Sequence, residues 1–154
     1  MTNLSCNVLQ ILAGKTLATA ESCTGGGIGA ALTAIPGSSS VYIGGVISYT
    51  NEVKNGLLGV DKSLLETCGA VSPEVAKAMA TGVRNLLKSD VAVSVTGLAG
   101  PGGDNFGNPV GKVFVGYADA EKCYAKDYQF AGSREDIRNQ TIQAALRLII
   151  QENG

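Results

Sequence analysis

The sequence predicts a single α/β domain over residues 1–154, a layered α/β/α sandwich around a mixed β-sheet. Short apolar segments typical of buried strands alternate along the chain with segments that have helical spacing and capping signals. Two strand-like segments joined by a polar turn near the C-terminus predict an antiparallel pair, so the sheet is expected to be mixed. The length is sufficient for one domain with a full hydrophobic core.

The first half of the chain contains two predicted strands, each followed by a helix. Pro36 and Gly37 end the first of these helices, and Asn51 is a suitable N-cap for the second. In chain order, the expected elements are an amphipathic helix over 4–13, a strand over 16–20, a helix over 25–34, a strand over 41–49 and a short helix from Asn51.

The second half begins with the clearest helix, because Ser72 can cap it, Pro73 stands at its first position and Glu74 complements its dipole. The last helix opens with Ser133 and Asp136 as a capping box. In chain order, the expected elements are a helix over 73–88, a buried strand over 90–96, an antiparallel pair over 111–118 and 123–130, and a helix over about 134–151.

The composition indicates a core of small aliphatic residues, since 45% of residues are hydrophobic, 5% are aromatic and 21 are glycine. A net charge of −1 provides no basic surface for nucleic acid or an anionic membrane. No apolar run approaches the roughly 20 residues that span a bilayer, and there is no secretory signal pattern. We therefore expect a cytoplasmic protein that binds neither nucleic acid nor membrane.

The chain contains no histidine, which excludes a Ser-His-Asp triad, a Cys-His dyad and any metal site with histidine ligands. Its four cysteines form no CxxC pair, so neither a zinc cluster nor a thioredoxin-like motif is indicated. Their thiols are expected to be reduced. These cysteines are Cys6, Cys23, Cys68 and Cys123.

Ser22 is the first candidate catalytic residue, because it lies between a predicted strand and a predicted helix in the run Ala20–Gly27. A tight turn there presents a hydroxyl together with backbone N–H groups. Without histidine, the base for a serine nucleophile would most plausibly be a lysine. The alternative is a capping or turn hydroxyl. Cys23 is a rival nucleophile, but with no histidine to activate it we expect a small buried residue.

Three polar loops, 21–27, 49–54 and 96–111, each follow a predicted strand. Ligands of open α/β sheets bind beyond the carboxyl ends of strands, so these loops are expected to converge. Thr24 to Gly27 would open a helix whose free N–H groups could bind an anion or oxyanion. Alternatively, these glycines only allow close packing between helix and strand.

Tyr49 and Lys54 lie in the second loop. Lys54 would occupy the first turn of a helix, where the dipole and partial burial both disfavour its charged form. A lysine with a lowered pKa can act as a base near neutral pH, and Tyr49 could relay a proton. The alternative is an exposed helical lysine and a half-buried strand tyrosine.

The third loop contains a glycine-rich segment, 97–103, that could cradle a phosphate, although it has no Walker pattern. Arg134 and Arg138 are one helical turn apart and could clamp a phosphate or carboxylate. The alternative is a solvated helix face. Glu21 and Asp104 are candidates for orienting a lysine or an amide.

Eight runs of the sequence resemble the CinA C-terminal domain family, which includes the nicotinamide mononucleotide deamidases. The runs cover nearly the whole chain in the order that the family has them. The segment 104–108 departs from the family pattern, because Asn108 stands where a charged Glu-Lys pair is usual. The matching runs are 20–26 (AESCTGG), 36–39 (PGSS), 45–54 (GVISYTNEVK), 58–60 (LGV), 69–72 (GAVS), 95–103 (VTGLAGPGG), 109–111 (PVG) and 132–138 (GSREDIR).

The resemblance implies hydrolysis of nicotinamide mononucleotide to nicotinate mononucleotide and ammonia, with no metal or organic cofactor. It also implies a homo-oligomer, a dimer or larger. The family's catalytic serine, tyrosine and lysine fall on Ser22, Tyr49 and Lys54, an arrangement similar to that of serine β-lactamases. The residues expected to bind substrate are Glu21, Thr24, Gly25, Gly26, Thr96, Gly97, Gly100, Gly102, Arg134 and Arg138.

Two other functions remain open at this point. The same pocket could serve a non-catalytic module that binds a nucleotide for regulation, in which case substrate would bind without release of ammonia. A related Ser-Lys amidase could instead act on another small carboxamide, through an acyl-enzyme on Ser22.

Overall fold

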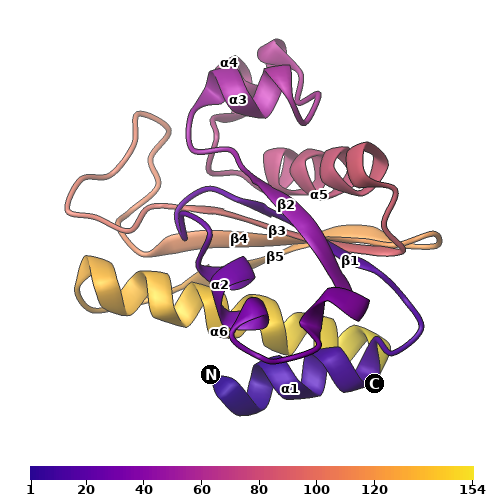
Figure 1. Cartoon of the computed structure of the whole chain (residues 1–154). Coiled ribbons are helices and arrows are strands. Elements are labelled where there is room, and N and C mark those ends of the chain that lie inside the picture. The colour runs from indigo at the N-terminus through magenta and orange to yellow at the C-terminus, as the bar shows by residue number, and fades with distance from the viewer.

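The computed structural model describes residues 1–154 and confirms the predicted single-domain α/β architecture with a mixed sheet. The five strands lie in the order β2-β1-β3-β4-β5 (Figure 1). The first three are mutually parallel, whereas β4 runs antiparallel to β3 and to β5. Their bounds are β1 Leu17–Glu21, β2 Tyr42–Ile47, β3 Val91–Gly97, β4 Lys112–Ala118 and β5 Cys123–Gln129.

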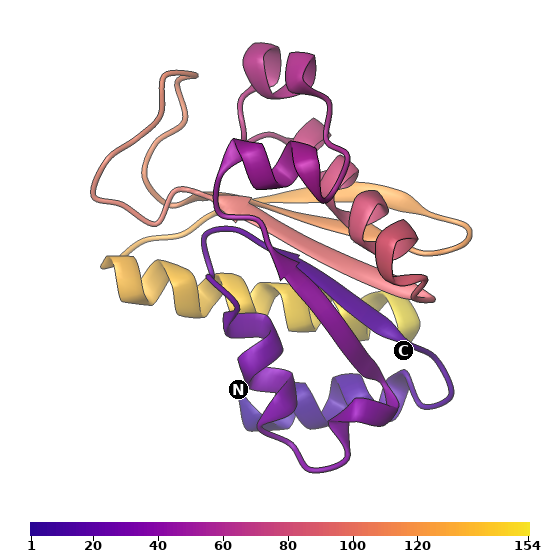
Figure 2. The same cartoon turned by 45° about the horizontal axis from the view of Figure 1, so that its top comes forward.

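Helices cover both faces of the sheet, as Figures 1 and 2 show. On one face α6, the longest helix, packs against β3 and β4 and is flanked by α1 and α2. On the other face α5 crosses β1, β3, β4 and β5, with α3 and α4 beside it. Their bounds are α1 Thr2–Ile11, α2 Gly27–Thr33, α3 Asn51–Gly56, α4 Lys62–Cys68, α5 Pro73–Leu87 and α6 Arg134–Asn153.

The central strands are buried because each of their faces meets one of two hydrophobic clusters. In β1, Leu17 belongs to the cluster on the α6 side, whereas Ala18 and Ala20 belong to the cluster on the α5 side. Every residue of β1 is consequently buried, as expected for a strand covered on both faces. Small side chains at these positions let the helices approach the sheet closely.

The predicted helix starts at Ser72 and Ser133 are confirmed, whereas α1 begins two residues before its predicted start, at Thr2, and α2 begins two residues after it, at Gly27. The Ser72 side chain accepts from Val75 N, and Ser133 and Asp136 form the reciprocal capping box of α6. The prediction for α3 was wrong by one residue, since Thr50, in extended conformation, is the N-cap and its side chain accepts from Val53 N. Two short elements were not predicted. They are α4, whose N-cap makes no side-chain bond, and a 3₁₀ turn over Ser38–Ser40.

The carboxyl ends of the parallel strands meet at one edge of the sheet, as predicted. Glu21, the last residue of β1, is in register with Ile47 at the end of β2 and with Val95 near the end of β3. The loops that follow these strands therefore emerge side by side. This convergence brings polar groups from three distant parts of the sequence to one place.

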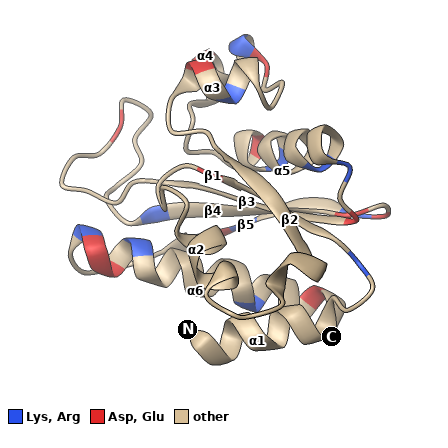
Figure 3. Ribbon diagram, viewed as in Figure 1, with Lys and Arg blue, Asp and Glu red and all other residues tan.

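Charged residues are distributed over the helices and loops of both layers, with both signs interspersed (Figure 3). Strands β2 and β3 contain none. None of the helices is both long enough and apolar enough to cross a bilayer.

Gly82 should be required for the packing of α5, because a Cβ atom there would lie 2.0 Å from the carbonyl oxygen of Leu58. We expect Gly82→Ala to lower the free energy of unfolding by about 1–3 kcal/mol, although alanine is normally the better helix former. Gly56→Ala is the matched control, since no atom lies within 4 Å of its added Cβ. Denaturant unfolding of both variants checks this; equal or greater stability of Gly82→Ala would contradict it.

Candidate active site

Ser22 is held at the edge of the sheet by backbone hydrogen bonds to both neighbouring strands. Its N–H donates to Val95 O at 3.2 Å, and the carbonyl of the preceding residue, Glu21, accepts from Ser48 N at 2.7 Å. Ser22 is buried, and it lines a cavity. The backbone at Ser22 is thus anchored to the sheet on both sides.

Lys54 reaches this hydroxyl from α3. Its Nζ lies 3.0 Å from Ser22 Oγ and 2.6 Å from Ser48 O, and the residue is only 1% exposed. Both hydrogen-bond partners are neutral oxygens, and no carboxylate forms a salt bridge with Lys54. Burial therefore lowers the pKa of Lys54 to about 8. An amine with this pKa and at this distance can accept a proton from a serine hydroxyl.

Cys23 has the opposite character. It is 6% exposed, and burial raises the pKa of its thiol to about 11. The thiolate is the reactive form of cysteine, and it is scarce here at neutral pH. The structure therefore favours Ser22 over Cys23 as the nucleophile.

Tyr49 contributes to the lining of the cavity at its solvent-exposed side. Its hydroxyl accepts from Arg134 Nη2 at 3.0 Å, and its side chain is largely exposed. It makes no hydrogen bond to Ser22 or Lys54. Arg134 also donates from Nη1 to Gly100 O, so one guanidinium links the end of β2 to the glycine-rich loop.

The cavity has a volume of about 290 Å³, at the lower end of the range for small-molecule sites. Thr96 fixes one wall, because its Oγ1 donates to Ala70 O at 2.8 Å. The lining includes eight of the predicted residues, namely Ser22, Tyr49, Lys54, Thr96, Gly97, Gly100, Gly102 and Arg134.

Some lining residues were not predicted. Ala70 and Val71 come from the segment between α4 and α5, and Asn51, Leu98 and Ala99 complete the wall with Cys23. The signal that could have identified Ala70 and Val71 was their place in a run, 69–72, that matches the family.

Several backbone N–H groups in the lining make no hydrogen bond to another residue of the chain. One belongs to Cys23, directly after Ser22, and Ala99, Gly100 and Gly102 of the glycine-rich loop contribute three more. Unpaired N–H groups of this kind are suitable donors to an oxyanion or a phosphate oxygen.

Five of the predicted substrate-binding residues do not line the cavity: Glu21, Thr24, Gly25, Gly26 and Arg138. The Glu21 carboxylate points into the protein and accepts from Thr24 Oγ1 and from the first N–H groups of α2. The N-terminus of α2 is therefore occupied by an internal carboxylate, and the anion site expected there is not available. Arg138 donates to backbone carbonyls of the turn.

Asp104 was expected to orient a lysine or an amide of the site, and the structure does not support this. Its carboxylate accepts from Phe106 N, Asn108 N and Asn108 Nδ2, which folds the loop upon itself. Asn108 Nδ2 also donates to Val71 O at 3.0 Å. In this chain the residue that departs from the family pattern anchors the loop to the wall of the cavity.

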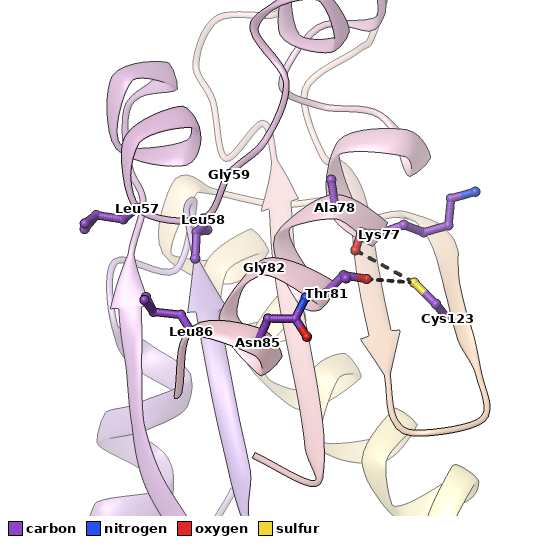
Figure 4. Close-up of a pocket in the computed structure, with 10 residues that line it drawn as sticks. All are labelled: Leu57, Leu58, Gly59, Lys77, Ala78, Thr81, Gly82, Asn85, Leu86 and Cys123. Atoms are coloured by element: carbon purple, nitrogen blue, oxygen red, sulfur yellow. Dashed lines mark hydrogen bonds between the residues drawn. The ribbon is translucent and has the colours of Figure 1, made fainter. Parts of the chain in front are cut away.

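A larger hollow of about 850 Å³ lies between α3, α5 and the start of β5 (Figure 4). Leu57 and Leu86 line one part of it, and Cys123 lies at the opposite end, with Sγ 3.3 Å from Thr81 Oγ1. It contains no nucleophile paired with a base. Of these two cavities, only the smaller one contains a hydroxyl in contact with a buried amine.

Comparisons with known proteins agree with this architecture. The family model described as the CinA C-terminal domain matches residues 2–153. A CinA-like protein of Geobacter metallireducens is 53% identical over 133 residues, which are 86% of this chain and 32% of the relative. A CinA-like protein of Synechococcus is 61% identical over 110 residues, 71% of this chain and 26% of the relative. The chain thus spans between about a quarter and a third of the length of these curated relatives.

Solved structures show the same fold. The competence/damage inducible protein CihA of Agrobacterium tumefaciens is 38% identical, with a TM-score of 0.95 over 99% of this chain and 95% of that one. A CinA superfamily protein of Escherichia coli is 34% identical, with a TM-score of 0.96 over 98% of this chain and 89% of that one. By sequence and by fold, this chain belongs to the CinA C-terminal domain family.

Proposed function

We propose that this chain is an amidohydrolase that converts nicotinamide mononucleotide to nicotinate mononucleotide and ammonia through a serine nucleophile. The observation that carries the proposal is the 3.0 Å contact between Ser22 Oγ and the buried Lys54 Nζ. A buried amine with a lowered pKa is the base that a serine needs in a chain without histidine. The substrate follows from the resemblance to the deamidases of this family.

The reaction begins with neutral Lys54 accepting the proton of Ser22 Oγ while the oxygen bonds to the carboxamide carbon. The carbonyl oxygen becomes an oxyanion, for which the unpaired N–H of Cys23 is the nearest backbone donor along the chain. Lys54 then transfers the proton to the amide nitrogen, the carbon–nitrogen bond of the carboxamide breaks, and ammonia leaves. Water attacks the resulting ester, releases the carboxylate and restores the Ser22 hydroxyl.

The phosphate of the substrate requires donors at a distance from the reacting carbon. The loop residues Ala99, Gly100 and Gly102 offer unpaired N–H groups, and Arg134 adds a cation at the mouth of the same cavity. This pairing of N–H groups with a guanidinium is typical of phosphate recognition. The mouth is also where Tyr49 lies, which suits it to contact the substrate before the reaction.

Incubation with nicotinamide mononucleotide in the presence of a chelator should release ammonia and nicotinate mononucleotide in equal amounts. Ser22→Ala should reduce kcat by at least about a thousandfold, because it removes the oxygen that forms the ester. Ammonia assay and chromatography of the nucleotide measure both. Nucleotide binding without ammonia release would instead indicate the regulatory module. Turnover of a different carboxamide would indicate the related amidase.

The rate should increase with pH through the pKa of Lys54, about 8, because only the neutral amine can accept the proton. We expect kcat/KM to rise about tenfold per pH unit on the acid side and to level off near pH 9 or above. Lys54→Arg should be inactive at every pH, since a guanidinium stays protonated. A pH-independent rate between about pH 6 and pH 9 would exclude Lys54 as the base.

Cys23→Ala should retain kcat within about threefold, because the buried thiol is protonated and takes no part in the chemistry. The same assay, with titration of the remaining thiols as a check on the protein, measures this. Loss of turnover in Cys23→Ala with full activity in Ser22→Ala would reverse the assignment of the nucleophile.

A further inference from the structure

Two charged side chains that do not line the cavity hold the turn on which Ser22 lies. We propose that Glu21 and Arg138 are positioning residues, which together fix the backbone of residues 22–25 so that Ser22 Oγ and the N–H of Cys23 face the substrate. This inference rests on the proposed role of Ser22 as the nucleophile. It gives Glu21 and Arg138 a task different from the binding of substrate.

Glu21 holds the turn from the α2 side. Its residue is 2% exposed, and Oε1 accepts from Thr24 Oγ1 at 2.7 Å and from Ile28 N at 2.8 Å. Oε2 accepts from Gly29 N at 3.0 Å and from Thr19 Oγ1 at 3.4 Å. A buried carboxylate with this many donors is held in one position and closes residues 21–29 into a compact unit.

Arg138 holds the turn from the α6 side. Its Nε donates to Cys23 O at 3.1 Å and its Nη2 donates to Thr24 O at 3.0 Å. Two donors with fixed spacing match two successive carbonyls, a geometry that a lysine cannot reproduce. A Cβ atom on Gly25 would lie 3.4 Å from Nη2, so the guanidinium lies directly against this glycine.

Three consecutive carbonyls of the turn are therefore held. Ser22 O accepts from Gly25 N at 3.1 Å, and the next two accept from Arg138, with Gly27 N also donating to Thr24 O. In a planar trans peptide the C=O and the following N–H point in opposite directions. Fixing Ser22 O and Cys23 O therefore also fixes the directions of the N–H groups of Cys23 and Thr24.

Neither of these N–H groups donates to another residue of the chain, and Cys23 lines the cavity together with Ser22. A donor that is fixed before the reaction stabilises a developing oxyanion without reorganisation. Loosening the turn would misplace the nucleophile and the donor together. Positioning errors of about 1 Å can reduce rates by about a hundredfold.

The test measures the reactivity of Ser22 without relying on the proposed substrate. The probe is a neutral fluorophosphonate: Ser22 Oγ bonds to phosphorus, fluoride leaves, and the serine proton passes to Lys54. Labelling is followed by intact-protein mass and located by peptide mapping. The variants are Glu21→Gln and Arg138→Gln, and circular dichroism and thermal unfolding verify that each is folded.

Each variant has a matched control. Arg147→Gln makes the same chemical change on an exposed residue of α6, and Glu74→Gln makes it on an exposed carboxylate in the first turn of α5. We expect labelling to slow by about 10- to 100-fold in Glu21→Gln and Arg138→Gln and to stay within about twofold in the controls. Unchanged labelling rates in both folded variants would overturn the proposal.

Steady-state kinetics with nicotinamide mononucleotide separate positioning from substrate binding. Positioning predicts that kcat falls while KM stays within about threefold, whereas direct phosphate binding by Arg138 predicts a raised KM with kcat unchanged, which would overturn the proposal. Arg138→Lys retains a cation that can donate to one of the two carbonyls, so its labelling rate should lie between those of the unmodified chain and Arg138→Gln. If Arg138→Gln or Glu21→Gln does not fold, Arg138→Lys or Glu21→Asp is used in its place. If the unmodified chain neither labels nor hydrolyses the nucleotide, the proposed function itself fails and this inference falls with it.

Discussion

The site depends on the burial of one amine among neutral oxygens. Lys54 Nζ contacts Ser22 Oγ and Ser48 O and has no carboxylate partner. Burial without a carboxylate partner raises the free energy of the charged amine relative to the neutral one. The pKa of Lys54 is therefore lowered to about 8. The same Ser48 donates its N–H to Glu21 O, so the base is tied through one residue to the strand that carries the nucleophile.

Two opposite charges are buried on either side of Ser22, and they differ in how they are satisfied. The Glu21 carboxylate accepts hydrogen bonds from Thr24 Oγ1 and from Ile28 N and Gly29 N of α2, which hold the turn in one conformation. Lys54 has two neutral acceptors and remains able to exchange a proton. Glu21 therefore holds the backbone of the turn, whereas Lys54 contacts the Ser22 hydroxyl itself.

The sequence was sufficient for elements whose signals are local. The helix cap at Ser72 and the capping box at Ser133 are side-chain bonds within one turn, and the structure contains both. It was less sufficient for short elements: α4 has only Leu65 fully buried and no capping bond, so its stability comes from packing against α5. The position of Ala70 in the cavity wall was also not predicted, because its residue type suggests no chemistry and only its place in the 69–72 run pointed to it.

The class of fold and the limits on the chemistry could be predicted from the sequence alone, because alternating strand and helix segments specify a layered α/β fold and a chain without histidine needs a base of another type. The polar side chains that reach the cavity could be identified only from the folded structure. Arg134 and Arg138 are one turn apart on α6, yet the first reaches Tyr49 and Gly100 at the mouth and the second reaches the backbone under the nucleophile. The physical reason is that helical spacing fixes only the direction in which each side chain leaves α6. The groups that each guanidinium contacts belong to loops from distant parts of the chain, and their positions depend on the whole fold.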